Sequence, residues 1–381
     1  MANQINARSP YFIYITDDGN LQSATLKLYV YTGTQNTSRP ATPTYTLTST
    51  AIDEKITFEI SELVRDYIVN TFDGSYTSSA VWVDYLIDRT VGGVVTTDEA
   101  YTQLAGFDGY GYFKDGSQGD KEGVFTNIND QTVLQSNTTI YKYDDEPLRF
   151  PVHISEDTDI TFLKNGNILT YTEYSTSTAS ADTIRYISTA TNGIDNYTER
   201  VLNDGGSVEA VECIDLGEVS LYGVDTILVK PNSSGVQKFT VVNIDECKYT
   251  PYKITFVNKF GAYQDVWFFK KSSLFLTTNK DAYKSNIITN GTYNTYSRQN
   301  SILTKNGNEK LMLNTGFYEE SYNEVFKQMS LSEEVWIEYE GQTLPVNIAS
   351  SEFNYKTKLN DKLINYTIEV EFSNDEINNI R

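Results

Sequence analysis

The chain has 381 residues, a formal net charge of −21 and a single histidine, His153, beside 29 tyrosines. Histidine is the only side chain that normally titrates near neutral pH, so Ser–His–Asp triads, His–carboxylate dyads and multi-histidine metal sites are mostly excluded. An acidic protein repels phosphate backbones, so we expect no specific nucleic-acid binding.

The abundance of Tyr, Thr, Val and Ile favours β-strands. The length suffices for two or three domains, each with its own core. We therefore predict a mainly β protein with two or three small β-sandwich-like or β-barrel-like modules and a few short helices. The predicted modules are an N-terminal sandwich-like module over 1–125, a connector with a middle β-module over 126–248, and a C-terminal β-module with one helix over 249–381.

The first module contains clear strand patterns. Apolar and polar residues alternate over 26–31, which is the period of a half-buried strand. Further strands are predicted over 45–48, 56–60 and 81–87, and Gly92–Gly93 predicts a turn. A short helix is expected next to residue 60, with Ser61 as its N-cap and an apolar stripe of Leu63, Val64, Tyr67 and Ile68. Residues 106–123 are rich in Gly and Asp and predict an exposed loop that closes the module.

The rest of the chain follows the same kind of pattern. Residues 124–150 predict a mostly extended connector. Strands are then predicted over 160–163, 168–171, 226–229, 239–242, 254–257, 266–269, 335–339, 344–348 and 366–372. Turns are predicted at Asn165–Asn167 and at 258–261. A polar tract over 277–309 precedes an apolar run at 310–313, and a helix is predicted over Tyr318–Met329, with Tyr322, Val325, Phe326 and Met329 on one side.

Metal and redox motifs are weak in this sequence. Four acidic residues have a spacing that invites a calcium-loop interpretation, namely Asp108, Asp115, Asp120 and Glu122. They lack the regular D-x-[DN]-x-[DN]-G order, so an exposed loop is the favoured interpretation. Cys213 and Cys247 lie 34 residues apart without a CxxC motif, and we favour two buried free thiols over a disulfide.

Carboxylates and aromatic residues leave two further alternatives. Paired glutamates supply the number of carboxyls that a glycosidase needs, at Glu319/Glu320, Glu333/Glu334 and Glu338/Glu340. Nothing isolates one of them in an apolar pocket, so no catalytic, cofactor-binding or metal-binding residue is proposed, and we predict that the protein is not an enzyme. His153 is expected to be an ordinary strand residue. Trp82, Trp267 and Trp336 lie in apolar strand patterns, which leaves exposed tyrosines as the platform for a sugar.

Several stretches resemble virion structural proteins of tailed bacteriophages, especially phages that infect Bacteroidetes and marine hosts. They are Ile254–Ser273, Leu313–Ile337 and Phe353–Phe372, together with the N-terminal third from Ser9–Pro10 to Phe107–Tyr110. The resemblance covers about two thirds of the chain and brings no catalytic residues with it. It implies a tail, neck-ring or connector protein, made in the host cytoplasm, that assembles around the channel through which DNA passes.

The absence of an apolar signal-peptide core in the first residues agrees with this expectation. No segment approaches the run of about 18 apolar residues that a membrane helix needs. The leading function is therefore a non-enzymatic virion component that contacts other phage tail or connector proteins, and the alternative is a host-surface or glycan-binding tail or baseplate adhesin. Ring order is expected to be sixfold or twelvefold, a number implied by the resemblance alone.

The third module is the predicted place of subunit contact. Residues 1–250 hold 16 Lys and Arg against 35 Asp and Glu, whereas residues 251–381 hold 14 against 16, so like copies repel each other least there. The terminal strand lacks proline and would offer unpaired backbone groups at a sheet edge. The candidate interface residues are Tyr366, Ile368, Val370 and Phe372.

Overall fold

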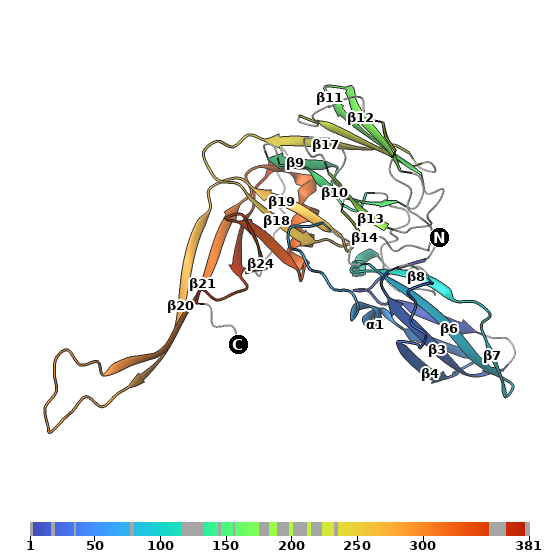
Figure 1. The fold of residues 1–381 in the computed structure, drawn as a ribbon, viewed down its shortest axis with the longest axis horizontal. Coiled ribbons are helices and arrows are strands. Elements are labelled where there is room, and N and C mark those ends of the chain that lie inside the picture. Colours follow the sequence, from blue (N-terminus) through green and yellow to red (C-terminus); the bar gives the residue numbers. More distant parts are fainter. Residues whose placement is uncertain are drawn as a thin grey trace. The chain divides into compact units, whose positions relative to one another are not determined.

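A computed structural model of the chain describes residues 3–16, 20–33, 36–76, 80–115, 133–143, 146–154, 157–174, 183–188, 198–200, 212–214, 223–231, 235–349 and 363–377. The described residues form several β-sheets and a few short helices, which confirms the predicted fold class (Figure 1). They group into two compact units. Unit 1 comprises Met1–Asp245, Thr255–Val266 and Glu324–Ser332, and unit 2 comprises Glu246–Ile254, Trp267–Asn323 and Glu333–Arg381. The three-module division of the sequence stays a prediction.

The N-terminal part of unit 1 is sandwich-like. Its larger sheet has the order β1-β8-β6-β3-β4, and β7 pairs with β6. The bounds are β1 (Asn3–Asn6), β3 (Leu21–Tyr31), β4 (Tyr45–Thr50), β6 (Val81–Val91), β7 (Val94–Thr97) and β8 (Thr102–Phe107). β2 (Phe12–Thr16) and β5 (Lys55–Glu59) form a separate two-stranded sheet.

Strand alternation places one face of each sheet in a common core. Leu26 and Leu28 of β3 are fully buried there, in a cluster that also contains Ile13 of β2 and Phe58 of β5. The neighbouring residues of β3 lie on the opposite face, because successive strand residues point to opposite sides. The strand predicted over 26–31 is therefore confirmed, and it extends back to residue 21.

The predicted helix next to residue 60 exists but is shorter and capped differently. It is α1 (Ser61–Arg65), and the N-cap position is Ile60, without a side-chain cap hydrogen bond. The Ser61 hydroxyl instead donates to a carboxylate oxygen of Glu59, the last residue of β5. The prediction of Ser61 as the cap is wrong because Ser61 is already the first helical residue, and the Glu59 carboxylate accepts hydrogen bonds from both its backbone N–H, at 2.8 Å, and its hydroxyl. Val64 of the predicted stripe is fully buried.

The second part of unit 1 consists of two sheets. The larger one has the order β15-β12-β11-β16-β17-β9, and the smaller one has the order β10-β13-β14. The bounds are β9 (Thr139–Tyr143), β10 (Arg149–Ile154), β11 (Thr158–Lys164), β12 (Asn167–Tyr174), β13 (Thr183–Ser188), β14 (Thr198–Arg200), β15 (Glu212–Ile214), β16 (Thr226–Pro231) and β17 (Gln237–Ile244). Phe150 and Val152 of β10 share a core with Phe162 of β11 and Phe239 of β17.

Two sequence predictions about this region have clear outcomes. The turn between β11 and β12 is confirmed, since Asn165 and Gly166 have φ angles of 51° and 77°. Such a pair of positive φ values is typical of the tight hairpin turn that Asn–Gly favours. The predicted connector contains β9, whose Thr139–Tyr143 segment pairs in parallel with β17 and so belongs to the sheet.

Residues 106–110 are not part of an exposed loop, contrary to the prediction. Phe107, Asp108 and Tyr110 are only 1%, 8% and 8% exposed. The backbone N–H of Tyr110 donates to the carbonyl of Lys259 at 2.8 Å, and Gly109 forms a β-bridge with Phe260. This segment is buried because its backbone pairs with the β18–β19 turn. The predicted loop from residue 116 onward lies outside the described residues.

Unit 2 is built on a seven-stranded sheet with the order β19-β18-β23-β24-β26-β21-β20. Its first two strands continue along the chain into unit 1. The bounds are β18 (Tyr252–Val257), β19 (Tyr263–Phe268), β20 (Ser273–Lys284), β21 (Asn300–Asn314), β23 (Val335–Tyr339), β24 (Gln342–Ile348) and β26 (Thr367–Phe372). β22 (Tyr318–Glu319) and β25 (Leu363–Ile364) form a separate short pair.

The helix predicted over Tyr318–Met329 is shifted toward the C-terminus. Tyr318–Glu319 is β22, Glu320–Tyr322 is a 3-10 turn, and the helix α2 spans Asn323–Leu331. Tyr318 is held in extended backbone because it pairs with Ile364 and because its hydroxyl donates to the carbonyl of Trp267 at 2.7 Å. The four residues of the predicted apolar side are nevertheless buried, namely Tyr322, Val325, Phe326 and Met329. A further 3-10 turn spans Phe113–Asp115.

Substituting Gly261 by alanine should destabilise unit 1 strongly. Gly261 has a φ of +74°, and an added Cβ would lie 2.8 Å from the backbone nitrogen of Asp108. The matched control is Gly166→Ala. Gly166 has a φ of +77°, and a Cβ added there would have no heavy atom within 4 Å. The control should lose about 1–2 kcal/mol in urea unfolding through backbone strain, and Gly261→Ala should lose about 1–3 kcal/mol more through the clash. Equal losses would show that the 106–110 segment is not tightly packed on this turn.

Candidate functional site

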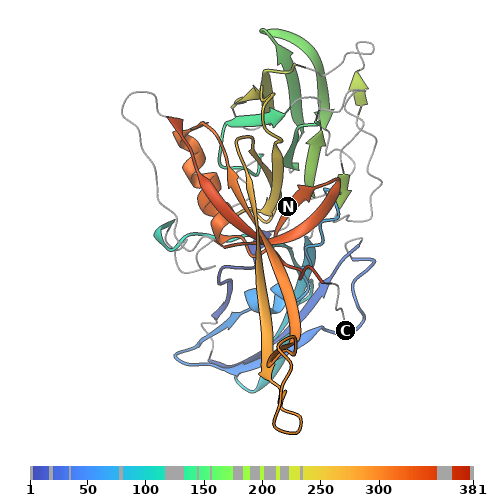
Figure 2. The same ribbon diagram turned by 90° about the vertical axis from the view of Figure 1, so that its left-hand side faces the viewer.

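The feature of unit 2 that distinguishes it from an ordinary sheet is a long two-stranded arm. We use the name arm for β20, β21 and the intervening residues 285–299. β20 pairs with β21 along its whole length, from Ser273 opposite Met312 to Lys284 opposite Asn300. β21 pairs with β26 only over Lys310–Asn314. Figure 2 shows the arm leaving the sheet as a narrow twisted ribbon.

The arm has an open sheet edge. β20 is the last strand in the order of the sheet, so its outer backbone groups have no strand partner among the described residues. On the other side, the C-terminal segment covers part of β21, since Glu376 N–H donates to the carbonyl of Gly307 at 2.8 Å. An unpaired edge of this length is a ready template for pairing with another chain.

The arm also exposes large apolar side chains, which normally lie in a core. Those of the two strands are Leu274 (47% exposed), Phe275 (49%), Leu276 (56%), Tyr283 (52%), Ile302 (51%) and Leu303 (71%). Those of the connecting loop are Ile288 (61%), Tyr293 (66%) and Tyr296 (84%). Contiguous apolar exposure of this kind marks interaction sites in stable proteins.

A β-bulge interrupts the pairing in the outer part of the arm. Asp281 faces Thr304, but the next residue, Ala282, faces Ile302, so Leu303 is the extra residue of the bulge. A hydrogen bond from the Thr304 hydroxyl to a carboxylate oxygen of Asp281, at 2.8 Å, fixes the position next to it. Bulges occur frequently at sheet edges and sites of function, where they redirect a side chain. Here the redirected side chain is an exposed leucine.

The charge of the arm is opposite to that of the rest of the chain. Residues 273–314 contain five Lys and Arg against two Asp and Glu, whereas all other residues contain 25 against 49. Lys310 at the base of the arm lies 3.3 Å from Glu369 and 3.4 Å from Glu371 of β26. The remaining basic residues of the arm are exposed, namely Lys280, Lys284, Arg298 and Lys305.

Sequence reasoning treated residues 277–309 as a polar tract and so missed the arm. The Asn290–Gly291 dipeptide, with φ angles of 51° and 77°, was the local turn signal. Apolar residues on both sides of this tract, at 274–276 and 302–303, were a second signal. Strict alternation is absent because both faces of the arm are exposed.

The predicted interface residues lie in the interior of unit 2. Tyr366, Ile368, Val370 and Phe372 are 5%, 5%, 0% and 8% exposed. β26 pairs with β21 on one side and with β24 on the other, so it is a central strand. The argument that this strand leaves backbone groups unpaired at an edge is therefore wrong. Without it, the assignment of these four residues to a subunit contact stays a prediction.

The other residues singled out by the sequence do not come together. His153 lies in β10, with its backbone opposite Ile184 of β13, as expected for a strand residue. Cys247 is an exposed free thiol, so the prediction of a buried thiol is wrong at this position. Cys213 lies in β15, opposite Thr172 of β12.

The calcium-loop interpretation gains no support from the described residues. A carboxylate oxygen of Asp108 accepts a hydrogen bond from the Asn70 amide at 2.6 Å. Asp120 and Glu122 lie outside the described residues, and the side chain of Asp115 does too. Within the part of the chain that the structure describes, no group of three or more His, Cys, Asp or Glu could hold a metal.

The candidate carboxylates and tryptophans are placed as follows. Glu319, Glu333, Glu334 and Glu340 are exposed, and Glu338 forms an ion pair with Lys253 at 2.7 Å. Glu324 accepts hydrogen bonds from the Tyr112 hydroxyl and the Gln328 amide, at 2.7 and 3.2 Å. The prediction that the tryptophans are core residues is confirmed, since Trp82, Trp267 and Trp336 are 1%, 8% and 6% exposed.

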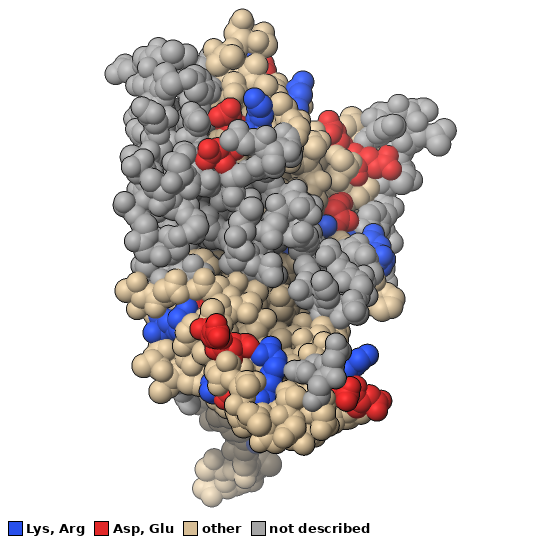
Figure 3. All heavy atoms as spheres, turned by 90° about the vertical axis from the view of Figure 1, so that its right-hand side faces the viewer, with Lys and Arg blue, Asp and Glu red and all other residues tan. Residues whose placement is uncertain are grey.

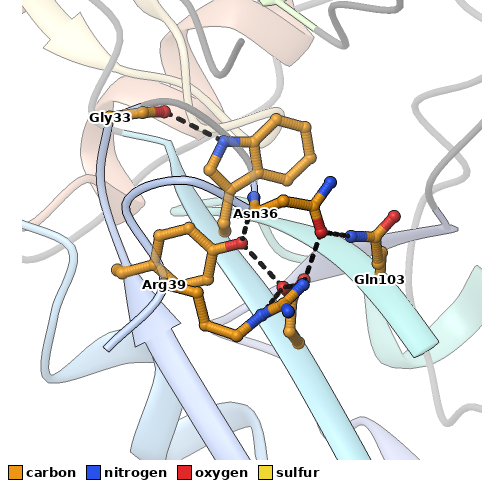
Figure 4. A network of polar contacts seen from close by, with 7 residues as sticks. Gly33, Asn36, Arg39 and Gln103 are labelled. Carbon is orange, nitrogen blue, oxygen red and sulfur yellow. Dashed lines mark hydrogen bonds and ion pairs between the residues drawn. The ribbon is translucent and has the colours of Figure 1, made fainter. Parts of the chain in front are cut away.

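A polar cluster lies on the face of the N-terminal sheet opposite its core. Asp84 of β6 is fully buried, and its Oδ2 accepts hydrogen bonds from Arg39 Nε at 2.6 Å and from the Tyr31 hydroxyl at 2.7 Å (Figure 4). Arg39 Nη2 lies 2.5 Å from the same oxygen. The guanidinium of Arg39 lies 3.6 Å from the ring centroid of Tyr101, a favourable cation–π geometry.

This cluster holds Gly33 and the residues from Asn36 to Arg39 on the sheet. Arg39 Nη2 and the Gln103 amide both donate to Asn36 Oδ1, at 2.6 and 2.7 Å. The indole N–H of Trp82 donates to the carbonyl of Gly33 at 3.1 Å. Among the buried side-chain polar atoms of this cluster, Asp84 Oδ1 alone has no hydrogen-bond partner. We assign the cluster a structural role, since it offers no nucleophile beside a base.

Charged side chains are mixed on the face of the molecule that Figure 3 draws. In Figure 3, acidic and basic residues alternate in small groups, and no basic patch gathers on the described part of this face. This distribution contrasts with the arm, where basic residues predominate. Among the described residues, no helix is long and apolar enough to cross a membrane.

A scan of the sequence against models of known protein families gives no match, and a search of curated proteins finds none either. The function is therefore inferred from the sequence and from the geometry of the arm.

Removing Arg39 should leave a buried charge without its partner. We expect Arg39→Met to lose about 3–5 kcal/mol of unfolding free energy, because Asp84 is fully buried. Arg39→Met combined with Asp84→Asn should recover part of this loss. The matched control is Arg89→Met, whose partner Asp98 is 23% exposed and which should lose about 1 kcal/mol or less. Similar losses at Arg39 and Arg89 in urea unfolding would contradict the structural role of the cluster.

Alkaline pH should lower the free energy of unfolding, because buried tyrosines ionise. Burial, followed by the hydrogen bond to Asp84, raises the pKa of Tyr31 well above its usual range, and burial raises the pKa of Tyr110 to about 12. The unfolded chain ionises its tyrosines near pH 10. The contribution of these tyrosines to the unfolding free energy should therefore be fully present below pH ~10 and should be lost as the pH rises toward 12.

The variant Tyr110→Phe isolates one of these groups, because its buried hydroxyl has no hydrogen-bond partner. It should match the parent near pH 8 and retain on the order of 2 kcal/mol more stability at pH ~11.5. Urea unfolding at each pH, with tyrosinate absorbance as a second readout, measures both effects. A parent and variant with the same pH dependence would contradict the raised pKa of Tyr110.

Proposed function

We propose that the protein is a non-enzymatic structural component of a tailed-phage virion, which assembles as a ring in the tail or head-to-tail connector around the DNA channel. The observation that carries this proposal is the arm. Over residues 300–309, β21 pairs with no strand other than β20 among the described residues, and apolar side chains of both strands are exposed. An isolated two-stranded ribbon is marginally stable in water, so an arm of this length is best explained by a partner that covers it.

Ring assembly follows from the type of contact that such an arm makes. A protruding arm and the surface that receives it are different patches, so each copy can contact two neighbours in a head-to-tail manner. Repeated contacts of this type close into a ring when the rotation between copies divides a full turn. The sixfold or twelvefold order and the virion location are taken from the resemblance of the sequence to phage structural proteins.

A structural role also agrees with the chemistry of the described residues. The paired glutamates are mostly exposed or engaged by a neighbouring side chain, and the buried Asp84 is neutralised by Arg39. Active sites normally combine a pocket with titratable groups that face into it. We therefore propose structural assembly rather than glycoside hydrolysis.

The alternative function, a host-surface or glycan-binding tail or baseplate adhesin, is favoured by one observation. Tyr14, Tyr67, Tyr283, Tyr293 and Tyr296 are the strongly exposed tyrosines among the described residues, and the last three belong to the arm. Exposed aromatic rings can stack on sugars. An arm whose loop carries two such rings, Tyr293 and Tyr296, could contact a glycan.

Location in purified particles distinguishes the two functions. If the protein is a ring component, a reconstruction of the intact particle should show multiple copies around the channel, and antibodies should label the neck or tail. Label confined to the distal tip, together with arm-dependent binding to host cells, would favour the adhesin. Absence of the protein from purified particles would contradict both virion functions. Portal, capsid and terminase genes beside the coding region would add independent support.

A further inference from the structure

We propose that the arm docks on an acidic surface of a second copy of this chain, with the bulged Leu303 and the basic residues around it as its contact points. This inference deepens the ring proposal by naming the element that makes the contact and the chemistry of the surface that receives it. It is tested on the purified protein, so it can hold or fail independently of the location of the protein in a virion.

Charge complementarity is the first reason to assign a second copy as the partner. The arm carries five Lys and Arg against two Asp and Glu, while the rest of each chain carries 25 against 49. Lys280, Lys284 and Lys305 are exposed and, among the described residues, form no ion pair. Each whole chain carries a net charge of −21, so two copies repel each other at long range, but the arm of one copy is attracted to acidic groups of another once they come close.

The bulge supplies the second reason. Leu303 is 71% exposed and is the extra residue of β21, so no residue of β20 lies opposite it. Ile302 beside it is 51% exposed. Natural sheet edges normally carry charged residues or proline at exposed positions, because apolar ones invite association. The arm thus combines an apolar centre with a basic surround, which is the composition of a protein-binding surface.

The open edge of β20 supplies the third reason. Twelve residues of β20, Ser273–Lys284, pair with β21 on one side and have no strand on the other among the described residues. A neighbouring chain can satisfy these backbone groups by adding a strand or a loop. Such a contact is specific for a polypeptide, whereas charge alone is not.

Nucleic acid is a poorer match for this surface than a polypeptide. Phosphate backbones are bound by dense Lys and Arg, and the apolar side chains of the arm would gain nothing from phosphates. The remaining 49 acidic residues of the chain repel DNA. Pairing of two arms is also disfavoured, because both arms carry the same net charge.

Zero-length cross-linking between lysine and carboxylate groups tests the contact directly. Light and 15N-labelled full-length protein are mixed in equal amounts and treated with a carbodiimide at low and high salt. We expect mixed-isotope cross-links from Lys280, Lys284 or Lys305 to Asp or Glu residues outside the arm. Their yield should fall at high salt, because exposed charges more than about 10 Å apart are screened.

Two pairs of variants identify the parts of the arm that matter. Leu303→Asn should weaken self-association, measured by light scattering and sedimentation, by about tenfold. Its control is Val95→Asn, at a 63% exposed apolar position on β7. Lys280→Glu, Lys284→Glu and Lys305→Glu together should weaken it about tenfold or more. The control, with the same change in net charge, is Lys55→Glu, Lys230→Glu and Lys238→Glu, all at exposed positions in unit 1. Far-UV circular dichroism and thermal unfolding establish that each variant is folded.

Association that depends on the arm variants and not on the controls, with mixed-isotope cross-links from the arm lysines, supports the proposal. Absence of such cross-links at the highest soluble concentration overturns it. Cross-links restricted to pairs of arms, or equal weakening by arm and control variants, also overturn it. Binding of random-sequence duplex DNA that is lost in the lysine variant, without self-association, would assign the arm to nucleic acid instead.

Discussion

Backbone hydrogen bonding along β21 is the constraint on which the shape of unit 2 depends. β26 pairs with β21 only over Lys310–Asn314, while β20 accompanies β21 from end to end. Inside the paired region, side chains of β21 such as Leu311 and Leu313 are buried. Outside it, the same strand has no second strand beside it among the described residues, and the C-terminal segment contacts it at Gly307, so residues 302–305 are exposed. The arm is the direct consequence of this limited pairing.

The two kinds of polar chemistry in the protein serve different purposes. In the N-terminal sheet, a fully buried carboxylate forms an ion pair with Arg39 and accepts a hydrogen bond from the Tyr31 hydroxyl, and this arrangement holds Arg39 on the sheet. The attraction is strong because little water screens it. On the arm, the charges are exposed and separated, so each contributes little by itself. Together they give the arm a sign opposite to that of the rest of the chain, which suits close-range attraction between the arm of one copy and acidic groups of another.

An assembly function accounts for features that would be costly in a monomer. Exposed leucines, an open sheet edge and a bulge in a two-stranded ribbon all favour contact with another chain. In the proposed assembly, the net charge of −21 makes separate copies repel each other until the arm of one meets acidic groups of another. The exposed Cys247 lies outside the arm and takes no part in this account.

The sequence by itself determined where about half of the described strands lie, because a residue pattern with period two reports directly which side of a strand is buried. It therefore predicted β3, β11, β12 and β26, and the turns at Gly92–Gly93 and Asn165–Gly166. It predicted the alternation of β26 but argued for a subunit contact from the case in which this strand lies at a sheet edge, whereas β26 is a central strand. The neighbours of a strand are set by pairing with distant segments, here β21 and β24, and alternation contains no information about them.

Only the tertiary structure decided the candidate site. The arm depends on the register between Ser273–Lys284 and Asn300–Asn314 across a loop of residues 285–299, and on a bulge that shifts this register by one residue. Neither strand is half-buried along its outer part, so the alternation that reveals other strands is missing there. Likewise, Ser61 looks like a helix cap in isolation, but the nearby Glu59 carboxylate binds its hydroxyl. The alternation of apolar and polar residues reveals the half-buried strands of this protein. Hydrogen bonding between distant segments forms the arm that we propose as its contact surface.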